Sequence, residues 1–167
     1  MKALAIFSTL LLGVHFATAH MPEEEKGTAA ENLGRQILVT FQNKSIKEYY
    51  HLFPSLEELH GLMMANSDAY SVFLDVAKKD FAKVYQKRIK PEIESAYLRT
   101  FYAGCELGIE WSEVIFVGAY EAESPRADGT SSLVIEFLSG QKNYKLLVEK
   151  VMILSGEWKT TQYINLI

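Results

Sequence analysis

Residues 131–159 read SSLVIEFLSGQKNYKLLVEKVMILSGEWK, and this stretch decides the fold. It contains two runs rich in apolar and β-branched residues, and each run is followed by a Ser-Gly pair, at 139–140 and at 155–156. Short glycine-containing links between such runs are typical of antiparallel hairpins. We therefore predict two neighbouring strands at 131–138 and 143–154.

Two further runs extend this hairpin on either side. Residues 111–123 centre on the apolar stretch VIFV and precede a turn signal, SPRADG, at 124–129. Residues 157–166 follow the second Ser-Gly pair and form the last run of the chain. The sequence thus predicts a four-stranded antiparallel meander.

The chain before Gly108 has a helical pattern instead. Apolar residues recur at helical spacing over 29–41, and capping-box patterns that begin at Ser45 and Ser55 predict two short helices. A stripe over 67–85 continues beyond Pro91, where a break or kink is expected, because proline cannot donate the helical hydrogen bond. We expect the continued stripe to face the core with Ile93, Ala96, Tyr97, Phe101 and Cys105. Helices followed by strands indicate an α+β domain, with N-terminal helices packed on a curved four-stranded antiparallel meander sheet.

This order of elements resembles the nuclear-transport-factor-2-like superfamily, in which a cone-shaped sheet wraps around helices. The strand pair LVIEFLSG at 133–140 and MILSGEWK at 152–159 carries most of the resemblance, which is one of organisation and covers about 29–167. Members of that superfamily include isomerases, dehydratases and ligand binders. The resemblance therefore implies a pocket and no particular chemistry.

The N-terminus follows the template of a cleavable secretory signal. Lys2 is the charged start, residues 3–14 are apolar, and Ala17-Thr18-Ala19 is the small-residue cleavage pattern. The apolar run is shorter than the roughly 20 residues that a membrane span needs, and no later stretch qualifies. We predict a signal peptide at 1–19, a flexible lead-in at 20–28, a single α+β domain at 29–167, and a secreted or periplasmic location.

Composition excludes some classes of partner. The net charge of −4 provides no basic field of the kind that nucleic-acid binders show. A basic run from Lys78 to Lys90 lies on the polar side of a predicted helix, as is typical of a solvated face.

Cys105 is the only cysteine, so we predict no internal disulfide and a buried thiol that packs as a small apolar group.

Two histidine patterns suggest metal chemistry, but both are incomplete. Cleavage after residue 19 would make His20 the first residue, where it could form a histidine brace for copper only if His51 or His60 approached it. Glu57 and His60 have the spacing of a di-iron motif, but only one copy is present. We predict no metal and no cofactor, and a hydrogen-bonded, partly buried His60.

The candidate ligand-binding residues are Tyr50, His51 and Glu136, with Tyr49 and Asp68 as further members of the same cavity set. Glu136 interrupts an otherwise apolar strand. If it points into a pocket, desolvation raises its pKa toward that of a useful acid or base. We favour the alternative that Glu136 faces water on the open side of the sheet, and that the aromatic residues belong to the core and the pocket rim.

Three function classes follow, and no catalytic residue is assigned. The sequence has no G-x-S-x-G elbow, H-E-x-x-H pair, paired C-x-x-C or phosphate-binding glycine loop. The leading hypothesis is an exported, non-catalytic binding or accessory domain whose partner is an unknown small ligand or protein. The alternative is a small lyase or isomerase that uses general acid–base catalysis in a cone-shaped pocket. The third is a homodimeric structural module that pairs through the open sheet face.

Asn43-Lys44-Ser45 matches a glycosylation acceptor in a host that glycosylates.

Overall fold

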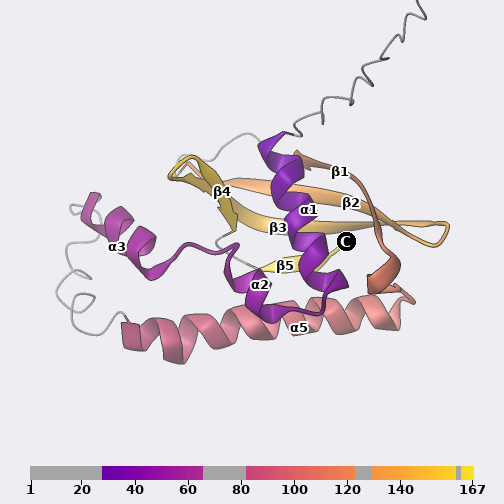
Figure 1. The fold of residues 1–167 in the computed structure, drawn as a ribbon, viewed down its shortest axis with the longest axis horizontal. Coiled ribbons are helices and arrows are strands. Elements are labelled where there is room, and N and C mark those ends of the chain that lie inside the picture. Colours follow the sequence, from indigo (N-terminus) through magenta and orange to yellow (C-terminus); the bar gives the residue numbers. More distant parts are fainter. Residues whose placement is uncertain (1–27, 66–81, 123–128, 161–162) are drawn as a thin grey trace, which may run out of the picture.

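The computed structural model describes residues 28–65, 82–122, 129–160 and 163–167, and helices precede a curled antiparallel sheet (Figure 1). The predicted α+β class is therefore confirmed. Several predictions concern residues outside these ranges. They are the signal peptide, the lead-in except Thr28, His20, Asp68 and most of the apolar stripe at 67–85.

The predicted helix starts at Ser45 and Ser55 are confirmed. The Ser45 hydroxyl accepts a hydrogen bond of 3.2 Å from the Glu48 backbone N–H. At Ser55 the capping box is reciprocal, because Glu58 donates its N–H to the serine hydroxyl and accepts the serine N–H in return. The helical elements are α1 (Ala29–Gln42), α2 (Ile46–Tyr50), α3 (Leu56–Ala65), the π-helix η1 (Tyr85–Ile89), α5 (Lys90–Glu106) and the 3₁₀-helix η2 (Trp111–Glu113).

The sheet contains the expected meander with one difference at its end. Its strands are β1 (Ile115–Glu121), β2 (Ser131–Ser139), β3 (Lys142–Leu154), β4 (Glu157–Thr160) and β5 (Ile164–Leu166). They are antiparallel in the order β1-β2-β3-β4, and β5 also pairs with β3. The predicted last strand, 157–166, is thus two strands. The long β3 accommodates both, because β4 pairs with residues 151–154 and β5 with residues 146–148.

Two glycines allow helices to approach their neighbours closely. A Cβ at Gly34 in α1 would lie 2.8 Å from the Cβ of Ala119 in β1. A Cβ at Gly104 in α5 would overlap the Trp111 ring. Both positions therefore exclude larger side chains for steric reasons. The close approach at Gly34 explains how α1 packs on the sheet, although glycine weakens a helix.

Aromatic rings fill the space between the helices and the sheet. Phe41 stacks on Tyr97 with ring centroids 4.7 Å apart, and on Trp111 at 4.6 Å. Trp111 in turn stacks on Phe137 of β2 at 5.6 Å. Tyr49 of α2 packs against Tyr97 and is only 1% exposed. In the part of the chain that the structure describes, the concave side of the sheet thus holds a packed aromatic core.

Helix α5 corrects one prediction about this core. The backbone adopts the wider π-helix just before Pro91, which has no N–H for the carbonyl one turn earlier. Beyond Pro91, the buried stripe continues through Thr100 and Gly104. Cys105 is exposed, so the prediction of a buried thiol is wrong. The buried stripe takes the i+3 step from Tyr97 to Thr100, whereas the prediction assumed the i+4 steps to Phe101 and Cys105.

Candidate functional site

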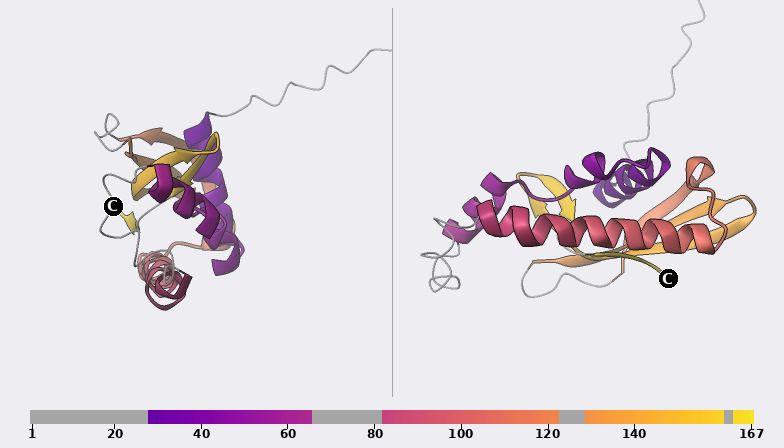
Figure 2. Two further views of the ribbon diagram at one scale, coloured as in Figure 1. Left: turned by 90° about the vertical axis from the view of Figure 1, so that its left-hand side faces the viewer. Right: turned by 90° about the horizontal axis from the view of Figure 1, so that it is seen from below.

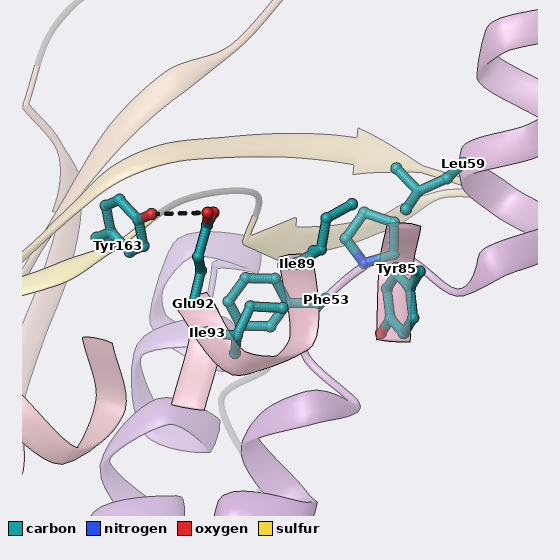
Figure 3. A pocket seen from close by; sticks show the side chains of 8 residues that line it. Phe53, Leu59, Tyr85, Ile89, Glu92, Ile93 and Tyr163 are labelled. Atoms are coloured by element: carbon teal, nitrogen blue, oxygen red, sulfur yellow. Dashed lines mark hydrogen bonds between the residues drawn. The ribbon is translucent and has the colours of Figure 1, made fainter. Parts of the chain in front are cut away.

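An apolar pocket of about 270 Å³ opens where α3, η1 and the start of α5 meet the end of the chain (Figure 3). Phe53 and Ile93, which are 8% and 5% exposed, form its base. Tyr163, at 36% exposed, lies at the rim. The remaining lining residues are Pro54, Leu59, Tyr85, Ile89 and Glu92.

Backbone contacts hold the segment that carries Phe53 and Pro54. The Thr160 N–H donates a 2.8 Å hydrogen bond to the Leu52 carbonyl, which ties this segment to β4. Pro54 restricts the residue before it to extended conformations, and the Ser55 capping box then starts α3 at once. Hydrogen bonds from Ser55 hold the pKa of Glu58 below its usual value. The capping carboxylate is therefore ionised at neutral pH.

A carboxylate and a phenol meet at one side of the pocket. The Tyr163 hydroxyl donates a 3.3 Å hydrogen bond to Glu92, and the two side chains point toward each other in Figure 3. The other oxygen of Glu92 lies 3.5 Å from the Arg88 Nε. The Arg99 guanidinium lies over the Tyr163 ring, 5.7 Å from its centroid. The pocket thus combines an apolar base with a polar edge formed by Glu92 and Tyr163, and each of these two residues contacts an arginine outside the pocket lining.

This arrangement suits binding of a small amphipathic molecule. Ligand pockets are mostly apolar with a few placed polar groups, and their volumes are roughly 300–1,000 Å³. At about 270 Å³ the pocket lies just below that range, so only a small ligand would fit. Its polar edge can accept hydrogen bonds through the Glu92 carboxylate and the Tyr163 hydroxyl oxygen, because the hydroxyl hydrogen of Tyr163 is already donated to Glu92.

Tyr50 is tied to α5. Its hydroxyl lies 3.4 Å from both the Lys90 carbonyl and the Glu94 carboxylate. Desolvation by burial, followed by the nearby Glu94, raises the pKa of Tyr50 to about 12. The phenol therefore stays neutral and fastens α2 to α5.

His51 is exposed at the C-terminal end of α2 and lines two depressions. One has a volume of about 380 Å³ and includes Trp158 and Lys159. The other, of about 310 Å³, includes Arg35 and Glu48. His51 is thus accessible, but it lies apart from the apolar pocket described above.

Glu136 lies on the face of β2 that points away from the helices. Its neighbours in the strand, Ile135 and Phe137, are fully buried on the other face. The Lys145 ammonium lies 2.7 Å from the Glu136 carboxylate, and the Tyr120 hydroxyl donates to the same oxygen at 3.3 Å. The hydrogen bond from Lys145 is the main reason that the pKa of Glu136 is lowered.

The three candidate residues therefore do not converge on one site. Tyr50 and His51 are consecutive, but Tyr50 contacts α5, whereas His51 lines two other depressions. The Glu92–Tyr163 pair was not predicted from the sequence, because its members are far apart in the chain. The Phe53-Pro54 pair directly before a capping box was a local signal that could have indicated a bend lined by apolar residues.

The residues that the structure describes contain no group of three or more His, Cys, Asp or Glu side chains that could hold a metal ion. Within the same residues, no helix is both long and apolar enough to cross a membrane. Glu57 and His60, which have the spacing of a di-iron motif, both lie on α3. The His60 side chain lies outside the part of the chain that the structure describes.

Comparisons with protein-family models, with curated proteins and with solved structures find no match to this chain.

Proposed function

We propose that this chain is an exported, non-catalytic binding domain whose apolar pocket takes a small amphipathic ligand. The observation that carries the proposal is the Glu92–Tyr163 pair at the edge of a pocket with a buried Phe53–Ile93 base. A ligand with an apolar body and one hydrogen-bond donor, such as an amine, would bury its body and give its donor to Glu92.

The fold in this proposal is a variant of the nuclear-transport-factor-2-like superfamily. Helices packed on a curled antiparallel sheet support that assignment. In this variant the aromatic core occupies the concave side of the sheet, and the ligand pocket lies at the edge of the domain.

The geometry favours binding over the lyase or isomerase alternative. That alternative needs a carboxylate such as Glu136 in one cavity with Tyr50 or His51. Glu136 is instead paired with Lys145 on the outer face of the sheet. The third class, a homodimer formed through the sheet face, stays a prediction, and the exposed Ile115 and Tyr120 of β1 are available for it.

A dye titration tests the pocket. N-phenyl-1-naphthylamine, a neutral apolar amine that fluoresces when it leaves water, should bind the wild-type protein and be displaced by hexylamine more readily than by hexanoate. Leu59→Trp should fill the pocket and weaken dye binding about tenfold or more, since burial of several apolar carbons is lost. Leu56→Trp is the matched control, because Leu56 lies on the same helix, is 40% exposed and does not line the pocket.

Three results would contradict the pocket proposal. The first is an absence of dye binding to the wild-type protein. The second is an equal loss of dye affinity in the two tryptophan variants. The third is a preference for hexylamine over hexanoate that is unchanged in Glu92→Gln.

Export is tested separately by intact-mass measurement. The proposed cleavage predicts a secreted chain that begins at His20. A secreted mass that still includes residues 1–19 would contradict it.

A further inference from the structure

Helix α5 has an exposed face opposite the face that it buries. The buried face carries Ile93, Ala96, Tyr97, Thr100 and Gly104. On the opposite side, Leu98 is 39% exposed and Tyr102 is 60% exposed. Viewed from below, α5 lies in front of the rest of the ribbon along its length (Figure 2, right). This face is therefore open to a partner in the described part of the molecule.

The residues of this face have the spacing of a coiled-coil seam. They follow one another in alternating steps of four and three residues, the repeat that keeps a stripe facing a second helix. Each of them is exposed. In order they are Pro91, Ser95, Leu98, Tyr102 and Cys105.

Two opposite charges flank the seam on its two sides. Glu94 leans toward α2, where its carboxylate lies 3.4 Å from the Tyr50 hydroxyl. Arg99 leans the other way, over the ring of Tyr163. In a parallel helix pair, a residue on one flank faces the residue five positions later on the other flank of the partner. Arg99 is five positions after Glu94, and the two residues lie on opposite flanks of the seam.

We propose that α5 pairs in parallel and in register with α5 of a second copy of this chain. Leu98 packs on the partner's Leu98 and Tyr102 on the partner's Tyr102. Glu94 of each copy faces the partner's Arg99, which gives two equivalent ion pairs about the two-fold axis. The seam is short and includes Pro91 and Ser95, so the dimer is weak and reversible.

A charge exchange tests this register by sedimentation equilibrium at increasing protein concentration. The wild-type protein should show a reversible monomer–dimer equilibrium. Arg99→Glu and Glu94→Arg should each weaken it roughly tenfold or more, because two attractive pairs become repulsive. The double variant Glu94→Arg/Arg99→Glu should restore dimerisation, which a general loss of folding could not do.

Cys105 reports the direction of the two helices. In the parallel register the two Cys105 side chains face each other, whereas an antiparallel pair holds them at opposite ends. With oxidised glutathione, one thiolate forms a mixed disulfide and releases one glutathione. The partner's Cys105 thiolate then displaces the second glutathione, so two thiols are oxidised and one glutathione disulfide is reduced. Wild type should cross-link faster than Arg99→Glu at equal concentration, and the double variant should regain the wild-type rate.

Several outcomes would overturn the proposal. One is a monomer at every concentration, and another is a dimer that Arg99→Glu leaves unchanged. A dimer that does not cross-link through Cys105 would indicate an antiparallel pair. A dimer that is lost in Val117→Lys but kept in Arg99→Glu would instead place the interface on the sheet, where Val117 of β1 is 50% exposed. Cys105→Ser should still dimerise, because the seam and not the thiol holds the pair.

Discussion

The Lys145 ammonium lies 2.7 Å from the Glu136 carboxylate, directly across the β2–β3 pair. Cross-strand neighbours of opposite charge stabilise a sheet modestly, and solvent screens such pairs at the surface. The hydrogen bond from Lys145 lowers the pKa of Glu136, while Glu136 in turn raises the pKa of Lys145. This carboxylate is therefore ionised at neutral pH and has a stabilising partner of its own.

Glu136→Gln should change thermal stability only slightly, and only above the acidic range. A lowered pKa in the folded state means that the stabilisation is present above the ordinary value of 4.5 and is lost as the pH falls through the lowered pKa. Melting curves of wild type and variant should therefore differ slightly at pH 7 and coincide at strongly acidic pH. High salt should also reduce the difference at pH 7.

Lys145→Gln is the control for this interaction. If the ion pair is the cause, the loss of stability in the double variant should be smaller than the sum of the losses in the two single variants. A large stabilisation by Glu136→Gln would instead indicate that the carboxylate is buried without a partner, contrary to the structure.

Tyr49→Phe should stabilise the fold, whereas Tyr97→Phe should destabilise it. The Tyr49 hydroxyl is buried and has no hydrogen-bond partner among the residues that the structure describes, and such a group costs about 1–3 kcal/mol. The Tyr97 hydroxyl donates a 2.8 Å bond to the Thr40 carbonyl, worth about 1 kcal/mol. Urea denaturation of the two variants measures both effects. Equal destabilisation by both would mean that Tyr49 has a partner, such as a bound water.

Alkaline titration should show tyrosines that ionise only when the protein unfolds. Burial raises the pKa of Tyr97 to about 12 and raises that of Tyr49 further, from an ordinary value of 10.0. Their stabilising contribution is therefore present below pH 10 and is lost as the pH rises toward 12. Phenolate absorbance should increase in two stages, and the second stage should coincide with the loss of helical circular dichroism. Ionisation of all tyrosines near pH 10 with the fold intact would contradict this.

Much of the fold could be predicted because local chemistry specifies it. The capping residues Ser45 and Ser55 start helices, and the glycines at 140 and 156 lie in turns with positive φ between antiparallel strands. The end of the chain was harder to predict, since the division of 157–166 into β4 and β5 depends on the length of β3. The exposure of Cys105 depends on which of two helical steps the core selects, and spacing alone does not decide between them.

The candidate site was less accessible to sequence reasoning. Glu136 was expected to face water on the open side of the sheet, and it lies on the strand face opposite Ile135 and Phe137, because alternation places neighbours on opposite faces. Its partner Lys145 depends on the β2–β3 register, which the turn at Gly140 sets. The pocket joins three separate segments of the chain, and only their three-dimensional packing brings Glu92 to Tyr163.

Gly104→Ala should destabilise the protein, while Gly61→Ala should not. A Cβ at Gly104 would overlap the Trp111 ring, which is held on its other faces by Phe41 and Phe137. Overpacking of this kind costs about 1–3 kcal/mol, which exceeds or offsets the gain of up to about 1 kcal/mol in helix propensity. At Gly61 of α3 an added Cβ has no atom of the described structure within 4 Å, so only the propensity gain remains. Urea denaturation should therefore shift the midpoint downward for Gly104→Ala and leave it unchanged or higher for Gly61→Ala. A stabilised Gly104→Ala variant would show that Trp111 does not pack against α5 as the structure describes.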